Sequence, residues 1–317
     1  MAGKLRVAVL MGGKSPEHEI SLISGRQVVS NLNPQKYDVI PIVISRDGRS
    51  LRLNNKKYSL SQLSIINCQL FFIAMHGPYG EDGTVQGFLE LVGVLYTGSG
   101  VLASALSMDK ISSRKLFTQA GLNVPKYQVV EKGKRTRKVR FGWPVFVKPY
   151  NQGSSVGASI VKSSRELNKA LKHAWRYSRL ALIEEYLKGV EITCPILGNK
   201  NPRTLPLVEI VPKKPFFDFE AKYSERLCDE IVPARIGKVL TRDAQDAAVV
   251  AYQTLGCRGF ARVDMIIKDS KVYVLEVNTI PGLTPVSLFP KSAQATGISY
   301  QKLLDQIISL GLQKENP

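Results

Sequence analysis

The stretch GFARVDMIIKDSKVYVLEVN (residues 259–278) decides the fold, because it predicts a β-hairpin. Two runs rich in apolar and β-branched residues, 259–267 and 271–278, flank the polar turn Lys268-Asp269-Ser270. Side chains alternate between the two faces of a strand, so each run should place its polar residues on one side of the sheet. The hairpin therefore predicts a sheet with one apolar face and one polar face.

The polar face of this hairpin would carry Arg262 and Asp264 on one strand and Glu276 and Asn278 on the other. If the strands pair, two carboxylates and an amide oxygen meet beside an arginine. Oxygen ligands of this kind suit Mg²⁺, which keeps some of its waters and bridges phosphates. The alternative is a solvated sheet face with a cross-strand ion pair, in which Asn278 is only a turn residue.

A second candidate site combines Lys148 with the small-residue loop Gly153-Ser-Ser-Val-Gly157, between two predicted strands. Backbone N–H groups of such a loop can surround phosphate oxygens, and the lysine adds a positive charge. The loop lacks the G-x-x-x-x-G-K-[ST] order and precedes a strand, so it is not a Walker loop. A plain hairpin turn is the alternative.

Three further segments carry weaker signals. The strand-like segment 184–187 and Glu191 offer backbone groups and a carboxylate for adenine and ribose, although surface charge explains them better. Glu17 lies beside Ser15-Pro16, which is typical of a helix start. His76 follows a buried strand, where it either lines a pocket or holds its own loop. No Ser-His-Asp ordering is visible.

The first hundred residues predict an α/β domain. Apolar runs at 5–10, 37–44 and 70–75 are typical of buried parallel strands, and residues 15–32 and 84–91 have helical spacing. Polar or glycine-rich loops follow these runs, at the positions where α/β proteins tend to bind ligands.

Beyond this domain, helices and strands alternate less regularly. A helix is expected over 107–121, because a glycine and then a proline provide a stop signal there. Another is expected over 242–255 and a last one over 300–310. Residues 212–233 are polar and aromatic, and they predict a long functional loop.

The composition of the 317 residues is globular, with 44% hydrophobic and 22% charged residues. The net charge of +18 is attractive to polyanions, but the one dense basic run, 132–140, has no interleaved aromatic residues. We therefore expect no nucleic-acid partner. No apolar run is long enough to span a bilayer and no secretory signal is visible, so we expect no membrane partner and a cytoplasmic protein. Four widely spaced cysteines predict neither a disulfide scaffold nor a metal knuckle.

Taken together and in order, these segments resemble the D-alanine–D-alanine ligases of the ATP-grasp superfamily, over nearly the whole chain. The matching motifs are Gly12-Gly13-x-Ser15-x-Glu17-x-Glu19-Ile-Ser21, His76-Gly77, Gly80-Glu-Asp-Gly83, Met108-Asp-Lys110, Val147-Lys-Pro149, Gly153-Ser-Ser-Val-Gly157, Glu220-Ala-Lys-Tyr223, Arg262-Val-Asp264 and Glu276-Val-Asn278-Thr-Ile-Pro-Gly282. Each motif alone is weak, but their common order is specific.

The resemblance implies an ATP-grasp fold of mixed α/β and α+β class. An N-terminal α/β domain (1–106) would precede a central domain (107–200) and a C-terminal domain (201–317), and the last two would sandwich ATP. The implied reaction joins two D-alanine molecules through a D-alanyl phosphate, for peptidoglycan precursor synthesis. Two Mg²⁺ ions, with Mn²⁺ as a substitute, and a homodimer are also implied.

The same resemblance implies a role for each matching residue. The residues expected to bind ATP are Lys110, Lys148, Glu184, Glu185, Leu187, Glu191 and Lys222. The metal ligands would be Asp264, Glu276 and Asn278. Those expected to orient substrates or to stabilise the oxyanion are Glu17, Ser154, Tyr223, Arg262 and Gly282, and those expected to line the two substrate sites are Glu17, His76, Ser287 and Leu288.

Three rival interpretations make different predictions. Another ATP-grasp ligase or carboxylase would keep the metal ligands but has no reason to keep both Glu17 and Tyr223. The pair Lys222-Tyr223 also favours a second D-alanine over a hydroxy acid in this family. A nucleic-acid-binding protein would show a steep salt dependence of binding and no ATP turnover. An inactive scaffold is disfavoured because all three metal-ligand positions are kept.

Overall fold

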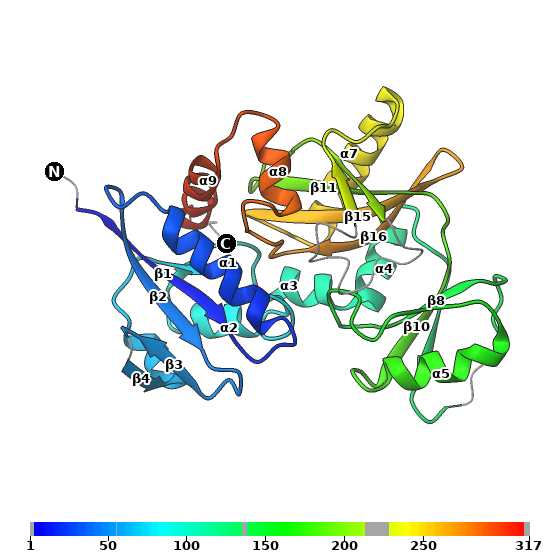
Figure 1. Cartoon of the computed structure of the whole chain (residues 1–317), viewed down its shortest axis with the longest axis horizontal. Coiled ribbons are helices and arrows are strands. Elements are labelled where there is room, and N and C mark those ends of the chain that lie inside the picture. The colour runs from blue at the N-terminus through cyan, green and yellow to red at the C-terminus, as the bar shows by residue number, and fades with distance from the viewer. Residues whose placement is uncertain (1–2, 55, 135–137, 213–227, 314–317) are drawn as a thin grey trace.

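The computed structural model describes residues 3–54, 56–134, 138–212 and 228–313, which form three β-sheets flanked by helices (Figure 1). In the view of Figure 1, the first sheet lies on the left, the second at the lower right and the third at the upper right. No helix among the described residues is long and apolar enough to cross a membrane.

The first sheet has the strand order β4-β3-β2-β1-β5-β6. Its strands are β1 (Leu5–Gly12), β2 (Tyr37–Ile44), β3 (Ser50–Leu53), β4 (Lys56–Ser59), β5 (Leu70–Ile73) and β6 (Leu95–Tyr96). The strands β2, β1, β5 and β6 are parallel, whereas the β3–β4 hairpin extends one edge in antiparallel fashion. The three predicted parallel strands are thereby confirmed, and the hairpin at residues 50–59 was not predicted.

Residues 7–10 of β1 are fully buried because helices cover both faces of this sheet. On one face α1 (His18–Asn31) and α9 (Tyr300–Leu312) pack against Val7 and Val9. On the other face α2 (Thr84–Leu91) packs near Ala8 and Leu10, with the short 3₁₀ helix η1 (Leu60–Ile65) beside it. Helix α1 begins three residues later than predicted, because residues 15–17 form a turn.

The second sheet is antiparallel, with the order β7-β10-β8-β9. Its strands are β7 (Tyr127–Glu131), β8 (Val145–Pro149), β9 (Ser159–Val161) and β10 (Leu180–Glu185). Helix α5 (Ser164–Ala174) covers one face, where Val145 and Val147 are fully buried. Strand alternation therefore turns Phe146 and Lys148 toward the opposite face.

The third sheet contains the hairpin on which the prediction began. Its strands are β11 (Val190–Leu197), β12 (Arg203–Thr204), β13 (Val208–Pro212), β14 (Cys228–Ile231), β15 (Phe260–Lys268) and β16 (Lys271–Asn278), in the order β14-β13-β11-β15-β16 with β12 paired to β11. Helix α7 (Lys238–Thr254) covers its apolar face. Strand β11 lies before residue 200 in the chain yet belongs to this sheet.

The β15–β16 hairpin contains a β-bulge that decides where its carboxylates point. Val272 and Val274 face the core under α7, but the register shifts so that Met265 pairs with Val274 while Asp264 pairs with Glu276. The additional residue is Leu275, after which the alternation is inverted. Without the bulge, strict alternation would turn Glu276 toward the core.

Two predictions about elements were wrong. The expected helix over 107–121 is two helices, α3 (Val101–Met108) and α4 (Lys110–Gln119), because Asp109 is extended and caps α4 by accepting from the N–H groups of Ile111 and Ser112, each at 2.9 Å. The loop expected over 212–233 contains the strand β14, which pairs with β13 even though Asp and Glu disfavour strands. Residues 213–227 of that loop lie outside the described residues.

Candidate functional site

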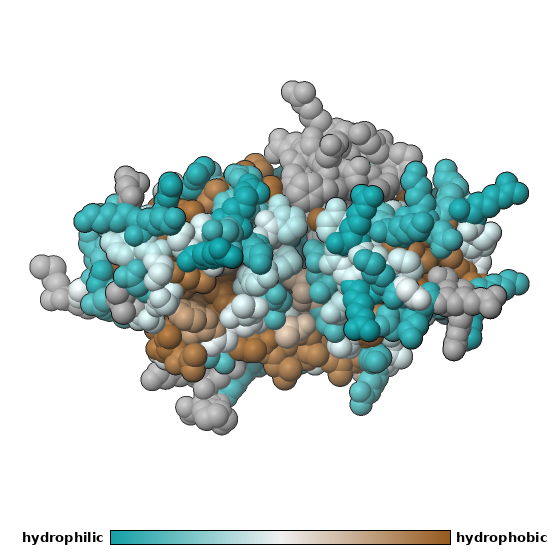
Figure 2. All heavy atoms as spheres, turned by 90° about the horizontal axis from the view of Figure 1, so that it is seen from below, coloured by the Kyte–Doolittle hydropathy of each residue, from teal (hydrophilic) through white to brown (hydrophobic). Residues whose placement is uncertain are grey.

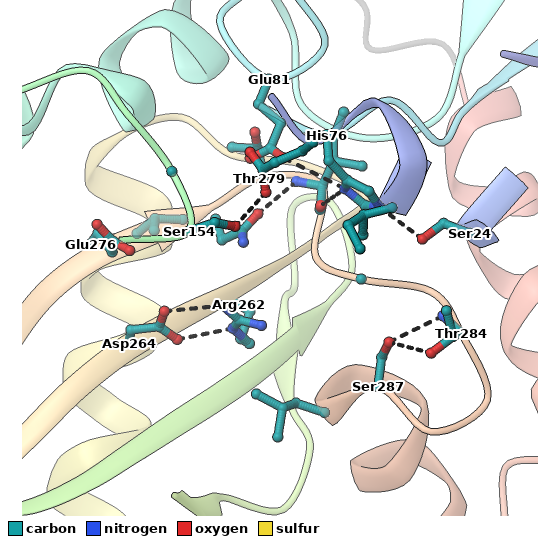
Figure 3. Close-up of a pocket in the computed structure, with 18 of the residues that line it drawn as sticks. Ser24, His76, Glu81, Ser154, Arg262, Asp264, Glu276, Thr279, Thr284 and Ser287 are labelled. Atoms are coloured by element: carbon teal, nitrogen blue, oxygen red, sulfur yellow. Dashed lines mark hydrogen bonds and ion pairs between the residues drawn. The ribbon is translucent and has the colours of Figure 1, made fainter. Parts of the chain in front are cut away.

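A cavity of about 560 Å³ lies between α1, the loops after β1 and β5, and the polar face of the β15–β16 hairpin (Figure 3). Twelve of the predicted site residues line it: Glu17, His76, Lys110, Ser154, Glu191, Arg262, Asp264, Glu276, Asn278, Gly282, Ser287 and Leu288. Four others, Lys148, Glu184, Glu185 and Leu187, do not line this cavity. The remaining two, Lys222 and Tyr223, lie outside the described residues, as does Glu220.

Arg262 and Asp264 form a forked ion pair on β15. The guanidinium donates from Nε to Oδ1 at 2.9 Å and from Nη2 to Oδ2 at 3.1 Å, and Figure 3 shows both contacts. The fully buried Thr193 on β11 donates from Oγ1 to the same Oδ1 at 2.6 Å. Asp264 is thus held in one orientation from two sides. Thr193 was not predicted; its position opposite Asp264 follows from the β11–β15 register.

Lys110, the first residue of α4, carries a buried ammonium group. Its Nζ donates to the backbone carbonyl of Gln152 at 2.8 Å and lies 3.1 Å from Glu276 Oε2. The cap at Asp109 fixes where α4 starts, and so it fixes the position of Lys110. Lys110 therefore connects the small-residue loop of the second sheet to the hairpin of the third.

Outside the cavity, Glu184 on β10 lies between two cations. Lys148 Nζ is 3.3 Å from Glu184 Oε2, and Arg114 Nη2 is 3.0 Å from Oε1. Burial lowers the pKa of Lys148, and the attraction of Glu184 offsets this only in part. Arg114 is fully buried, and its Nη2 also donates to the carbonyl of Leu275, the bulge residue, at 3.4 Å.

Arg114 therefore bridges the second and third sheets, although no sequence argument had singled it out. Its guanidinium also lies over the ring of Tyr127 at 5.7 Å. The other members of the predicted adenine segment have ordinary structural contacts: the carboxylate of Glu185 accepts from the backbone N–H of Lys126 at 2.8 Å, and Leu187 is buried.

Glu17 is buried at the start of α1, with its carboxylate between two glycines. A Cβ at Gly153 would lie 3.1 Å from Glu17 Oε2, and a Cβ at Gly77 would collide with the side chains of Glu17 and Ser15. The hydroxyl of Ser154 donates to Glu17 Oε1. Ser154 has φ 48°, in the left-handed region, so the small-residue loop holds this hydroxyl in an uncommon backbone conformation.

His76 is buried at the end of β5 and uses both ring nitrogens (Figure 3). Nδ1 donates to the carbonyl of Ile280 at 3.0 Å, since a carbonyl only accepts, and Nε2 is 2.8 Å from Ser24 Oγ. Glu81 Oε1 lies 3.6 Å from Nδ1. Burial opposes a charge on the imidazole, but the carboxylates of Glu81 and Glu17 and the Ile280 carbonyl outweigh it and raise the pKa of His76.

The far wall of the cavity is the turn between β16 and α8 (Leu288–Gln294). Ser287 Oγ lies 2.7 Å from Thr284 Oγ1 and accepts from the Thr284 N–H at 3.2 Å. A Cβ at Gly282 would lie 3.0 Å from Ser287 Oγ. The turn therefore brings a backbone N–H and a hydroxyl close together at the start of α8.

Sequence reasoning missed one whole wall of the cavity. Ile20, Ser24 and Gln27 line it from α1. Together with Glu17 they follow the spacing i, i+3, i+7 and i+10, which is one face of a helix. The signal was available, because a helix that begins at a functional carboxylate continues the same face into the pocket.

Comparison with known proteins extends over the whole chain. The family model described as D-ala D-ala ligase C-terminus matches residues 116–309, and the one described as D-ala D-ala ligase N-terminus matches residues 6–64 and 52–99. The chain is 44% identical over 315 residues to D-alanine–D-alanine ligase of Desulforudis audaxviator (strain MP104C). The aligned region covers 98% of this chain and 99% of that protein.

Two solved structures have the same fold. The D-alanine–D-alanine ligase from Bacillus anthracis complexed with ATP matches with a TM-score of 0.84 and 35% identity, over 97% of each chain. The VanG D-Ala:D-Ser ligase from Enterococcus faecalis matches with a TM-score of 0.85 and 33% identity, over 98% of this chain and 100% of that one.

The contacts of His76 predict a measurable pKa difference. In Glu81→Gln the carboxylate nearest to Nδ1 is lost, so the protonated imidazole is less stabilised and the pKa of His76 should fall. The chain has only three histidines, so His76 can be followed by NMR titration and assigned with His76→Gln. An unchanged titration midpoint in Glu81→Gln would show that Glu81 does not control this histidine.

Proposed function

The chain belongs to the D-alanine–D-alanine ligase family, and we propose how its pocket performs that family's reaction, the ATP-dependent joining of two D-alanine molecules. The observation that carries the proposal is the convergence of twelve predicted site residues on one cavity. The reaction supplies the D-alanyl-D-alanine used for peptidoglycan precursors.

Glu17 would bind the ammonium group of the first D-alanine. It is a buried carboxylate at the cavity wall, oriented by Ser154, so it can replace part of the hydration that the ammonium loses. Ser287 and Leu288, at the start of α8, would receive the second D-alanine, and His76 would line the space between them. Tyr223 is proposed to complete the first site from the loop that precedes β14.

The nucleotide would lie between the second and third sheets. Lys110 and Lys148 would contact its phosphates, joined by Lys222. The remaining contacts would come from the β10 segment and the strand after it: Glu184, Glu185 and Leu187 for adenine, and Glu191 for ribose. In support, Arg114 and Lys148 fix the Glu184 carboxylate before any ligand binds.

Asp264, Glu276 and Asn278 fit a site for two Mg²⁺ ions by the chemistry of their donors. Asp264 and Glu276 are register partners on neighbouring strands, and Asn278 is next on the same face, so all three offer hard oxygens to one side of the cavity. The side-chain amide oxygen of Asn278 would be the third donor beside the two carboxylates. Bound there, Mg²⁺ or Mn²⁺ would offset the negative charge on the phosphate oxygens.

The chemistry would proceed through a D-alanyl phosphate. The carboxylate of the first D-alanine attacks the γ-phosphorus of ATP, ADP leaves, and the amine of the second D-alanine then attacks the acyl carbon. Arg262 and the N–H of Gly282 would stabilise the tetrahedral oxyanion; each donor of this kind is typically worth about 3 kcal/mol. Inorganic phosphate leaves as the peptide bond forms.

We also propose the domain boundaries 1–106, 107–200 and 201–317 and a cytoplasmic location. The division is supported by the three sheets, which follow one another along the chain. Strand β11 is the exception, because it precedes residue 200 but belongs to the third sheet. The location is proposed because the reaction consumes ATP.

The test of this function is ADP release by the purified protein with Mg²⁺-ATP and D-alanine, with the product identified by mass. We expect ADP and D-alanyl-D-alanine in equal amounts. Parallel reactions with L-alanine, D-serine and D-lactate measure the selection of the second substrate. If the protein binds ATP but releases no ADP with D-alanine, the assigned reaction is wrong.

Glu276→Gln should lower turnover at least about a hundredfold, because an amide binds a divalent cation far more weakly than a carboxylate does. Titration with Mn²⁺, followed by calorimetry, should show weakened binding in the absence of substrate. Asp269→Asn, in the turn of the same hairpin, is the matched control and should behave as wild type. Wild-type Mn²⁺ affinity in Glu276→Gln would contradict the metal assignment.

A homodimer is proposed from the apolar surface of α2 and α3. Leu91 is 85% exposed and Leu102 is 70% exposed, on two helices that pack against each other. Figure 2 shows apolar side chains gathered along the lower edge of the face seen from below. Large exposed apolar groups of this kind are typical of subunit contacts.

The double variant Leu91→Glu/Leu102→Glu should therefore sediment as a monomer, because burying two carboxylates in an apolar contact is unfavourable. Analytical ultracentrifugation of wild type should give the mass of a dimer. Val239→Glu alters an equally exposed residue (74%) on α7 and should leave the mass unchanged. A dimeric double variant would exclude this surface as the contact.

A further inference from the structure

The excess positive charge of the chain is concentrated in its central part. Residues 107–200 contain 19 of the 44 Lys and Arg residues but only six of the 26 Asp and Glu residues. They thus contribute most of the net charge of +18, and the proposed nucleotide contacts use only a few of these cations. The remainder need another explanation.

These cations form an ordered layer on the outside of the second sheet. Helix α5 exposes Arg165, Lys169 and Lys172, at the spacing i, i+4 and i+7 of one helix face, and Arg176 is exposed in the turn that follows. The three helical cations span about two turns, roughly 10 Å. Figure 2 shows the surface over α5, on the right of the view, as largely hydrophilic with long projecting side chains.

A second row of cations lies beside the first. Lys132, Lys134, Lys138 and Arg140 are exposed on the segment that follows β7. This segment is anchored at one end by the N–H of Lys132, which donates to the carbonyl of Arg179 at 2.9 Å. Further along, Gln128 on β7 accepts from the N–H of Arg140 at 3.2 Å.

The two rows cover the same face of the second sheet. The segment contributes Val139 and Phe141 to the apolar cluster under α5. Leu167 and Trp175, from the α5 region, pack against the same cluster. That cluster contains Val147, whereas Lys148 points to the other face. The basic layer is therefore separated from the nucleotide side by the thickness of the sheet.

Few acidic groups balance the layer. Glu131 pairs with Arg179 at 2.5 Å, and Glu166 accepts from the backbone N–H of Lys162 at 2.9 Å. Arg179 belongs to neither row, and within the described part of the chain none of the cations of the two rows forms an ion pair. Charges left unpaired on one surface produce a local field that attracts a polyanion.

Two exposed aromatic side chains follow the cations in the chain. Tyr177, directly after Arg176, is 42% exposed, and Trp143, at the end of the segment, is 39% exposed. Between the cations of the described segment there is no aromatic residue on which a base could stack. Trp and Tyr are instead enriched at membrane–water interfaces, where their amphipathic rings lie at the level of the headgroups.

We propose that the outer face of the second sheet, formed by α5, the turn after it and the described residues 132–134 and 138–143, docks the protein reversibly on an anionic lipid bilayer. The cations would lie against lipid phosphates, and Trp143 and Tyr177 would enter the headgroup region. Binding through separate point charges should be weak at high salt, because screening at that ionic strength is strong over a few ångströms.

The first measurement is co-sedimentation with vesicles of equal parts phosphatidylglycerol and phosphatidylcholine, against vesicles of phosphatidylcholine alone. We expect binding to the anionic vesicles only, at about 0.1 M NaCl, with loss at about 0.5 M NaCl. Lys169→Glu/Lys172→Glu should lower the partition coefficient at least about 30-fold, since each cation near such a surface contributes roughly a factor of five. Lys56→Glu/Lys302→Glu makes the same charge change on exposed residues elsewhere and should bind as wild type.

Fluorescence gives an independent readout, because the two tryptophans, Trp143 and Trp175, both lie in this region. In Trp175→Phe, the emission of Trp143 should shift to shorter wavelength on binding anionic vesicles. Both double variants should keep ligase activity, which shows that they are folded.

Three outcomes would overturn the proposal. They are the absence of binding to anionic vesicles at low salt, an equal loss of binding in both double variants, and binding of a single-stranded oligonucleotide through this face while vesicles are ignored. None of them bears on the ligase reaction, which is measured separately by ADP release.

Discussion

The active site depends on one additional residue in a β-strand. Leu275 interrupts the alternation of β16, so the valines that precede it and the carboxylate that follows it face opposite sides of the sheet. The bulge leaves the Leu275 carbonyl outside the regular ladder, and Arg114 donates to it at 3.4 Å. The same guanidinium pairs with Glu184 on the second sheet. The bulge that exposes Glu276 is therefore also the point at which the second and third sheets are connected.

Electrostatic balance explains why so many charges can be buried in this region. Arg262 holds Asp264, Lys110 holds Glu276, and Lys148 with Arg114 holds Glu184. A buried charge without a partner costs several kcal/mol, whereas a hydrogen-bonded pair is tolerated. Each of these carboxylates therefore lies beside a cation before a ligand arrives, and burial lowers the pKa of one of those cations, Lys148. Preorganisation of this kind is what a site for phosphoryl transfer needs, because its catalysis rests mainly on positioning and charge.

The sequence allowed much of this to be predicted, and the failures have physical causes. The hairpin turn at Asp269-Ser270, the parallel strands and the polar face of β15 follow from local patterns and were confirmed. The break at Asp109 was missed because apolar spacing continues through it, and only a cap geometry distinguishes one helix from two. Arg114 and Thr193 were missed because their partners, Glu184 and Asp264, are distant in the chain. These contacts can be recognised only once the sheets are assembled. The face of α1 was predictable, since Glu17 and Ser24 are two turns apart on one helix.

The two faces of the second sheet carry separate sets of side chains, and this separation is a consequence of strand geometry. Along β8, Val145 and Val147 are fully buried under α5, while Phe146 and Lys148 face the nucleotide side. A substitution of an exposed cation on α5 leaves the apolar cluster between α5 and β8 intact, and salt screens the field of an exposed charge beyond about 10 Å. The surface charge of the central part can accordingly change widely without altering the orientation of Lys148 or Glu184. A strongly basic outer face is thus compatible with an unaltered candidate site, and this face accounts for part of the net charge of the chain.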